Sequence, residues 1–391
     1  MSFEFDDAPS GRGHHAQKWD DMGRLFGVTA EDAIPMFVAD MDFRAAPCIL
    51  DALRAEVDRG YMGYFGQTER VSAAVVGWMS GRHGWTFDPD ILRYTHGVVA
   101  GFATVLDAFS EPGDGVIVFS PVYHAFYGKA RAMGREIVES PLHIRDGRFE
   151  MDLDALGDAL RGHERILVMC SPHNPGGRLW TAGELREVAA FCERHDLLLL
   201  SDEIHMDLTF PGVAHVPTAV AAPEARPPRG TLSAASKGFH TAGGETGFVV
   251  IEDDTLRARF DLSHKSRGGT PNRFGMIMTR AAFTDGASWS EAVRAYLADN
   301  FALWRDRIGV LPGIEVMDMR STYLSWVDFR NTGCDAEEVR RRLNDDARIV
   351  MSPGPQFGTG GAGWHRFNIA MPRKRLEEAI GRIEAAFADL Q

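Results

Sequence analysis

The chain has little of what marks a secreted, membrane-spanning or disulfide-stabilised protein. Only four of its 391 residues are cysteines, and none stands in a CxxC pair, which argues against a disulfide framework and a zinc site. No run reaches the roughly 18 apolar residues of a membrane span. The start, MSFEFDD, is acidic and lacks an apolar segment, so we expect no signal peptide and a cytoplasmic protein without membrane partners.

Basic residues are outnumbered by acidic ones. The chain has 42 lysines and arginines against 55 aspartates and glutamates, a net charge of −13. A nucleic-acid-binding protein should have a basic excess, so we expect no such partner. Any phosphate group therefore needs a local site built for it. Hydrophobic residues make up 45% of the chain, which is typical of a folded globular protein.

Short apolar runs alternate with helical patterns in the middle of the chain. Strands are expected at 116–119, 166–169, 197–200, 231–235 and 247–251. The helix expected at 182–195 has Thr181 and Glu184 at the spacing of a capping box. Apolar strands joined by helices predict an α/β fold, with a mostly parallel sheet flanked by helices on both faces.

The pattern changes near Ser288, which predicts a large domain at 46–287 and a smaller α+β domain at 288–391. Residues 1–45 are expected to pack with the small domain. The run ARPPRG at Ala225–Gly230 is expected to be a surface turn. In the small domain we expect helices at 288–308, 336–343 and 374–390 and strands at 322–329 and 365–371.

Polar residues directly follow several of the apolar strands. Asn174 follows the strand at 166–169, Asp202 and His205 follow the run at 197–200, and Lys237 follows the strand at 231–235. Arg366 lies within the run HRFNIAM near the end of the chain. Ligands of such sheets bind beyond the carboxyl ends of the strands, which favours one site that these side chains line together.

The motifs NPGG, SDE, SK and RFN, in this order and spacing, resemble the aspartate-aminotransferase (fold-type I) family of pyridoxal-phosphate (PLP) enzymes, the class I/II aminotransferases. The likeness covers nearly the whole chain. Four further motifs resemble the cystathionine β-lyase-like C–S lyases of the MalY/PatB type: KWD at Lys18–Asp20, VADMDF at Val38–Phe43, PHNPGGRLW at Pro172–Trp180 and SDEIHMDL at Ser201–Leu208. The resemblance implies PLP as cofactor, a small-molecule amino-acid substrate and a homodimer with shared active sites.

Three residues would carry the catalysis, according to this resemblance. Lys237 would bind PLP covalently, and desolvation of its amine favours the neutral, nucleophilic form. Asp202 would keep the pyridine nitrogen protonated, so that the ring withdraws electrons; a helix N-cap is the alternative role. Tyr123 would stack on the ring, with ordinary core packing as the alternative.

The resemblance also implies the other contacts to the cofactor. Asn174 would bind its phenolic oxygen and His205 would tune that oxygen; a histidine satisfied at a strand end is the alternative role of His205. The backbone at Val98 and Val99, after Gly97, would bind the phosphate at a helix start. Ser236 could add a hydroxyl group to that site.

Tyr64 would reach the phosphate of the neighbouring subunit from the Gly-rich loop at Gly60–Gly66, again by resemblance. The alternative role for Tyr64 is an aromatic anchor of its own loop. Many relatives have an arginine eight residues after the lysine, where this chain has Glu245. A carboxylate beside a phosphate is unfavourable, so we expect Glu245 to face elsewhere or to pair with a cation.

Arg366 would bind the substrate α-carboxylate, because its planar fork suits bidentate recognition. The alternative is a surface arginine on a strand. Asn174 and Asp40 are expected beside the substrate as well. We expect no metal site, and His14 and His15 are interpreted as surface residues.

The implied reaction is α,β-elimination by a PLP-dependent C–S β-lyase, which cleaves cystathionine or cysteine S-conjugates to a thiol, pyruvate and ammonia. An aminotransferase of an L-amino acid needs the same catalytic residues, so the motifs leave that alternative open. A PLP-binding regulator without catalysis is disfavoured, because the chain has no basic extension for DNA.

Overall fold

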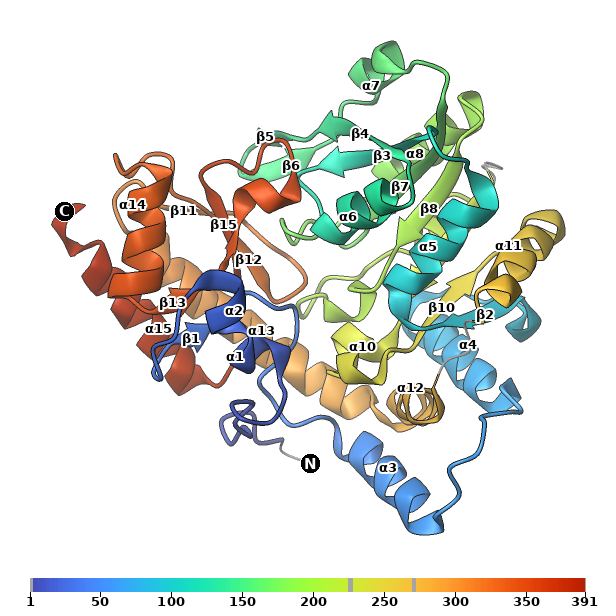
Figure 1. The fold of residues 1–391 in the computed structure, drawn as a ribbon, viewed down its shortest axis with the longest axis horizontal. Coiled ribbons are helices and arrows are strands. Elements are labelled where there is room, and N and C mark those ends of the chain that lie inside the picture. Colours follow the sequence, from blue (N-terminus) through green and yellow to red (C-terminus); the bar gives the residue numbers. More distant parts are fainter. Residues whose placement is uncertain (1–2, 224–227, 269–271, 391) are drawn as a thin grey trace.

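The computed structural model describes residues 3–223, 228–268 and 272–390 (Figure 1). Its main sheet has seven strands in the order β2-β10-β9-β8-β7-β3-β4. Their bounds are β2 Leu92–Thr95, β3 Gly115–Ser120, β4 Glu136–Pro141, β7 Glu164–Cys170, β8 Leu198–Asp202, β9 Arg229–Ser233 and β10 Gly247–Val250. The strands β4, β3, β7, β8 and β9 run parallel, whereas β10 is antiparallel to both of its neighbours. The expected α/β fold with a mostly parallel sheet is confirmed.

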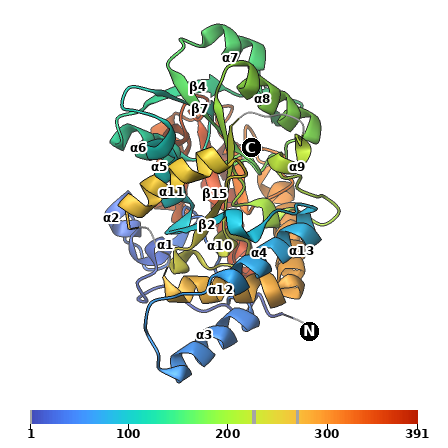
Figure 2. The ribbon, with the colours of Figure 1, turned by 90° about the vertical axis from the view of Figure 1, so that its right-hand side faces the viewer.

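Helices cover both faces of this sheet. Successive side chains of a strand point to opposite faces, so a strand that is apolar throughout needs helices on both. Val118 of β3 joins one apolar cluster, and its neighbour Ile117 joins another on the opposite face. Figure 2 shows the sheet between these two layers of helices. The helices packed on the two faces are α5 Gly97–Phe109, α6 His124–Ala132 and α11 Asp254–Ser266 on the first, and α8 Ala182–Arg194 on the second. The capping box expected at the start of α8 is present, with Thr181 and Glu184 bonded in both directions.

Three more helices pack together below the sheet in Figure 1: α3 Pro47–Arg59, α4 Glu69–His83 and α12 Arg273–Asp285. Smaller elements complete this part of the chain: β5 His143–Arg145, β6 Arg148–Glu150, α7 Leu153–Ala159, α9 Thr218–Ala221 and α10 Ala235–Gly238. The expected turn at Ala225–Gly230 lies partly outside the described residues, and its last two residues already belong to β9.

The C-terminal part begins with the long helix α13 Ala287–Ile308 and has a sheet of order β11-β12-β15-β14. Its strands and helices are β11 Glu315–Val316, β12 Leu324–Asp328, α14 Ala336–Arg341, β14 Ser352–Pro353, β15 Trp364–Asn368 and α15 Arg373–Ala386. After α14, residues 342–346 continue as a π-helix. Figure 1 shows these elements together at one side of the molecule.

The N-terminal segment lies against the C-terminal part. It contains the short helices α1 Gln17–Asp20 and α2 Met22–Phe26, followed by β1 Ile34–Pro35. The strand β1 pairs in parallel with β13 Ile349–Val350. Within the described part of the chain, no helix combines the length and apolar character that crossing a bilayer requires.

Candidate active site

Three parallel strands end at one pocket of about 380 Å³. Asp202 is the last residue of β8, Asn174 follows the end of β7, and Lys237 lies in α10, directly after β9. The pocket brings together most of the side chains that the sequence predicted, namely Lys237, Asp202, Asn174, His205, Tyr123, Ser236, Val98 and Val99. These side chains therefore lie together at the carboxyl ends of the parallel strands.

The amine of Lys237 points towards the N-terminal segment. Its Nζ donates a hydrogen bond to the carbonyl oxygen of Ala39 at 2.6 Å. Burial lowers the pKa of Lys237 to about 8, although the charge of Asp40 acts in the opposite direction. A substantial fraction of this amine is therefore neutral near physiological pH, as a nucleophile or base requires.

Asp202 is a buried carboxylate whose charge is stabilised by few neighbouring groups. One oxygen accepts a hydrogen bond from the backbone N–H of Ile204 at 3.1 Å. Burial, and then the charge of Glu203, raise the pKa of Asp202 to about 7. A cationic N–H donor bound in the pocket would relieve this penalty.

His205 is neutral and has a free ring nitrogen. Burial lowers its pKa to about 3. Within the described residues, its Nδ1 is buried without a hydrogen-bond partner. Buried polar atoms are nearly always bonded, so Nδ1 is available to a ligand. The histidine is therefore not satisfied by the protein alone, in contrast to the alternative considered from the sequence.

The helix α5 begins at the pocket, where its first N–H groups can bind an anion. Gly97 has a φ of +73°, which favours glycine. A Cβ atom on Gly247 would lie 2.9 Å from the backbone at Gly97 and at Val98, so the backbone is closely packed here. Sequence reasoning missed His96, which also lines the pocket directly before this helix.

Glu245 is also among the residues that line the pocket, and the expectation that its carboxylate faces away from a phosphate or pairs with a cation stays a prediction. A short 3₁₀ turn, Ala242–Gly244, ends at Glu245 with a φ of +41° and brings this residue to the site. The side chain is exposed, so water can solvate the carboxylate there.

Arg366 is a buried cation, 2% exposed, on β15. Its guanidinium donates to Asn174 Oδ1 at 3.0 Å, to the Phe37 carbonyl at 2.7 Å and to Ser352 Oγ at 3.3 Å. Its Nε has no partner among the described residues, and none of their carboxylates forms an ion pair with it. Burial lowers its pKa to about 10. An unpaired buried arginine is an incomplete anion site, and a surface role is excluded.

Three predicted residues are not among those that line this pocket: Arg366 (which bonds to Asn174 of the pocket), Asp40 and Tyr64. Asp40 adjoins Ala39, and its Oδ1 lies 3.5 Å from the ammonium of Lys18. Tyr64 is fully exposed on the loop between α3 and α4, away from the pocket of its own chain. The role predicted for Tyr64 requires a neighbouring subunit, and it remains a prediction.

Two residues without a predicted role contribute to the same region. The hydroxyl group of Tyr323 donates to the Ala39 carbonyl at 3.0 Å. The amide of Asn368 donates to the carbonyls of Val38 and Asp40 at 2.6 and 2.5 Å. Asn368 belongs to the motif RFN, which was the available signal, whereas nothing in the local sequence marked Tyr323.

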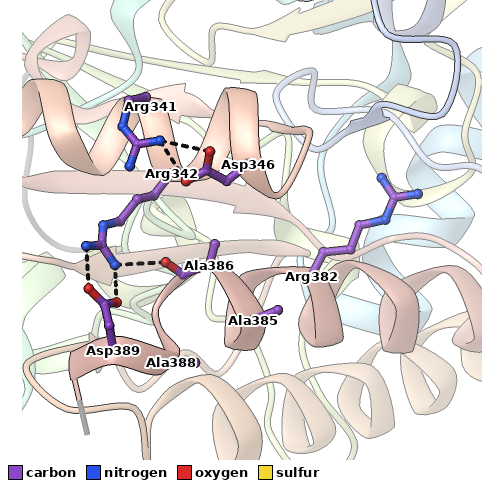
Figure 3. A pocket seen from close by; sticks show the side chains of 8 residues that line it. All are labelled: Arg341, Arg342, Asp346, Arg382, Ala385, Ala386, Ala388 and Asp389. Carbon is purple, nitrogen blue, oxygen red and sulfur yellow. Dashed lines mark hydrogen bonds and ion pairs between the residues drawn. The ribbon is translucent and has the colours of Figure 1, made fainter.

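A second hollow lies on the C-terminal part and is rich in arginine (Figure 3). Arg341 is paired with Asp346 at 2.8 Å, and Arg342 with Asp389. Arg382 is paired with Glu378 at 2.6 Å. Because these guanidinium groups are already neutralised by carboxylates, the hollow is a poor anion site compared with the pocket beside Arg366.

The fold and the pocket define a class of protein, and comparison of the sequence with known families identifies that class. Residues 34–383 match the family described as Aminotransferase class I and II. The chain belongs to this family.

Particular relatives are similar over nearly the whole chain. The chain is 35% identical to the protein named cystathionine beta-lyase PatB of Bacillus subtilis, over 98% of this chain and 100% of that protein. It is 30% identical to protein MalY of Escherichia coli, over 97% of each. The crystal structure of cystalysin from Treponema denticola, described as containing pyridoxal 5′-phosphate, has a TM-score of 0.95 at 31% identity and covers all of both chains.

Proposed function

We propose that the protein is a PLP-dependent C–S β-lyase that acts on cystathionine or cysteine S-conjugates. One observation carries this function: a lysine with a lowered pKa and a buried carboxylate line one pocket, and an unpaired buried arginine bonds to Asn174 of that pocket. Relatives named for cystathionine cleavage, similar along the whole chain, support the choice of reaction.

The residues of the pocket fit PLP. Asp202 would pair with the ring nitrogen, and the free Nδ1 of His205 and the amide of Asn174 would lie on its polar edge. The N–H groups at the start of α5, with Ser236, would hold the phosphate. Lys237 would attach it covalently. When bound, PLP supplies an electron sink that stabilises negative charge at the substrate Cα.

In this proposal Arg366, Lys237 and Asp202 each have a separate task. Arg366 holds the substrate α-carboxylate and completes its own buried ion pair. Lys237 Nζ, when neutral, takes the proton from Cα. Asp202 would hold the proton at the ring nitrogen. The Cβ–S bond then breaks, and with one water the substrate yields one thiol, one pyruvate and one ammonium ion.

An aminotransferase would use the same lysine, aspartate and arginine. The two reactions differ in the fate of the substrate nitrogen, which leaves as ammonia in elimination and passes to a 2-oxo acid in transamination. The test compares L-cystathionine, an S-alkyl cysteine and L-aspartate, with and without an added 2-oxo acid. We expect thiol release from both sulfur substrates without an acceptor. Turnover that depends on the acceptor and keeps the carbon skeleton intact would favour the aminotransferase.

A homodimer with shared active sites is part of the proposal. Tyr64 is fully exposed, and Tyr61 and Met62 beside it are 61% and 56% exposed. Exposed apolar side chains grouped on one loop suit a subunit interface. Arg273 donates to the carbonyl of Gly63 at 3.1 Å, which fixes the loop in place. Tyr64 of the partner subunit would then contact the phosphate of PLP.

We also propose the division into a PLP-binding domain at 46–287 and a small domain at 288–391, with 1–45 packed on the latter. The pairing of β1 with β13 supports the placement of the N-terminal segment. A cytoplasmic location is proposed because all four cysteines are free thiols, as in a reducing compartment.

A further inference from the structure

Residues 36–42, here called the strap, pass beside Lys237, and Ala39 of the strap lines the pocket. Four consecutive carbonyl groups of the strap, from Phe37 to Asp40, accept hydrogen bonds from side chains of the active-site region. The donors are Arg366 to Phe37, Asn368 to Val38 and Asp40, and both Lys237 and Tyr323 to Ala39. The position of the strap therefore determines what the amine of Lys237 meets.

The motif KWD anchors the strap from the N-terminal helix α1. Lys18 is only 1% exposed, and its Nζ lies 3.5 Å from Asp40 Oδ1 and 3.2 Å from Asp42 Oδ2. The same ammonium donates to the Asp40 carbonyl at 3.4 Å. Trp19 donates from its indole N–H to Asp42 Oδ1 at 3.0 Å. A buried lysine between two strap carboxylates is costly unless both partners stay in place.

The two carboxylates depend on Lys18 to different degrees. Asp42 has a second cation, Arg375, at 3.4 Å and the indole of Trp19. Asp40 has Lys18 as its ion-pair partner, and its buried Oδ1 accepts no hydrogen bond within the described residues. Loss of Lys18 would therefore leave Asp40 without its cationic partner, whereas Asp42 would keep Arg375.

The stranded carboxylate would act on groups that face it from other elements. Lys237 and His240 face Asp40 from α10 and the turn after it, and Tyr323 faces it beside β12. Arg366 and Asp202 are the other charged groups that act on Lys237. Of these, Lys237 carries the reacting amine.

We propose that Lys18 is a positioning residue, whose buried ammonium holds the strap in register and neutralises Asp40 beside the Lys237 amine. Lys18 touches neither substrate nor cofactor and acts through Asp40. The proposal deepens the proposed function and rests on the binding of PLP at Lys237. It gives the KWD motif a physical role: α1 sets the charge next to the reacting amine.

The test measures the pKa at Lys237 in two ways. In the holoenzyme without substrate, the visible absorbance of PLP bound at Lys237 is titrated against pH. In the PLP-free protein, the pH dependence of Lys237 modification by acetic anhydride is followed by mass spectrometry. In Lys18→Met both midpoints should rise by about half a pH unit or more, because Asp40 is no longer neutralised.

Three variants control for charge and folding. Lys18→Arg keeps the cation and should retain the wild-type midpoints. Lys18→Met combined with Asp40→Asn removes the stranded charge, so the midpoints should return towards the wild-type values even if Lys18→Met alone folds poorly. Lys374→Met removes an exposed lysine of α15 and should change neither midpoint.

The outcomes separate this inference from the proposed function. Wild-type midpoints in Lys18→Met, or an equal rise in Lys374→Met, would overturn the role of Lys18. A wild-type protein that binds no PLP would contradict the proposed function, whereas the anhydride measurement would still decide the effect of Lys18 on Lys237.

Discussion

The replacement Asp202→Asn should stabilise the PLP-free protein at pH 8. The carboxylate of Asp202 is buried without a cation bonded to it, and its pKa is raised to about 7 from 3.8. Between these two values the folded protein holds a proton that the unfolded chain releases. The free energy of unfolding therefore falls as the pH rises from about 4 to about 7, and it stays low above pH 7.

The size of the effect follows from the two pKa values. At 1.36 kcal/mol per pKa unit, the ionised carboxylate costs about 4 kcal/mol of stability at pH 8. Asparagine carries no charge, and its side-chain oxygen can still accept the bond from Ile204. For a chain of this length, about 4 kcal/mol corresponds to a rise in Tm of roughly 5 °C.

Thermal unfolding of PLP-free wild type and Asp202→Asn should be compared between pH 5 and pH 8. The difference should widen with pH, and added PLP should raise the Tm of the wild type more than that of the variant. Asp207→Asn is a matched control of opposite sign. Burial acts to raise the pKa of Asp207, but hydrogen bonds from His83 and Trp78 lower it overall.

The control should therefore lose stability at pH 8, because the folded protein favours the charged form of Asp207, which asparagine lacks. If PLP-free Asp202→Asn were no more stable than the wild type at pH 8, the carboxylate would not be a buried charge awaiting a cationic partner. The proposed contact with the ring nitrogen would then lose its physical basis.

Three further outcomes are expected. Lys237→Ala should release no pyruvate, and borohydride reduction should leave no PLP attached to the chain, as mass spectrometry would detect. Arg366→Lys should raise KM at least about 10-fold for every amino-acid substrate, since one lost charge-assisted hydrogen bond costs about 1.5–3 kcal/mol; equal KM values would place the α-carboxylate elsewhere. Mixing Tyr64→Phe with Lys237→Ala subunits should restore part of the activity, because one site of each hybrid dimer then carries neither change; no recovery after proven subunit exchange would contradict a shared site.

The residues at the centre of the site could be predicted because the sequence immediately around each of them marks its position. Asn174, Asp202 and Lys237 each follow an apolar strand closely in the chain, and a parallel sheet brings those strand ends together. The apolar run at 247–251 was also expected as a strand. Its antiparallel direction could not be predicted, because a buried strand has the same composition in either direction.

The strap could not be predicted, because its contacts join distant parts of the chain. Lys18, Asp40 and Tyr323 meet only after the N-terminal segment packs on the C-terminal part. The sequence showed KWD and VADMDF as motifs. It did not show that the lysine of KWD is buried against the two carboxylates of VADMDF. The place of Glu245 at the pocket could not be predicted either, because an unusual backbone conformation brings this residue there.

The most direct test of the account is pyruvate release from L-cystathionine by the PLP-loaded wild type, with no 2-oxo acid present. Elimination predicts pyruvate and thiol in equal amounts over many turnovers, and none of either from Lys237→Ala. Pyruvate that appears only when a 2-oxo acid is supplied, or no release of thiol at all, would contradict a C–S β-lyase.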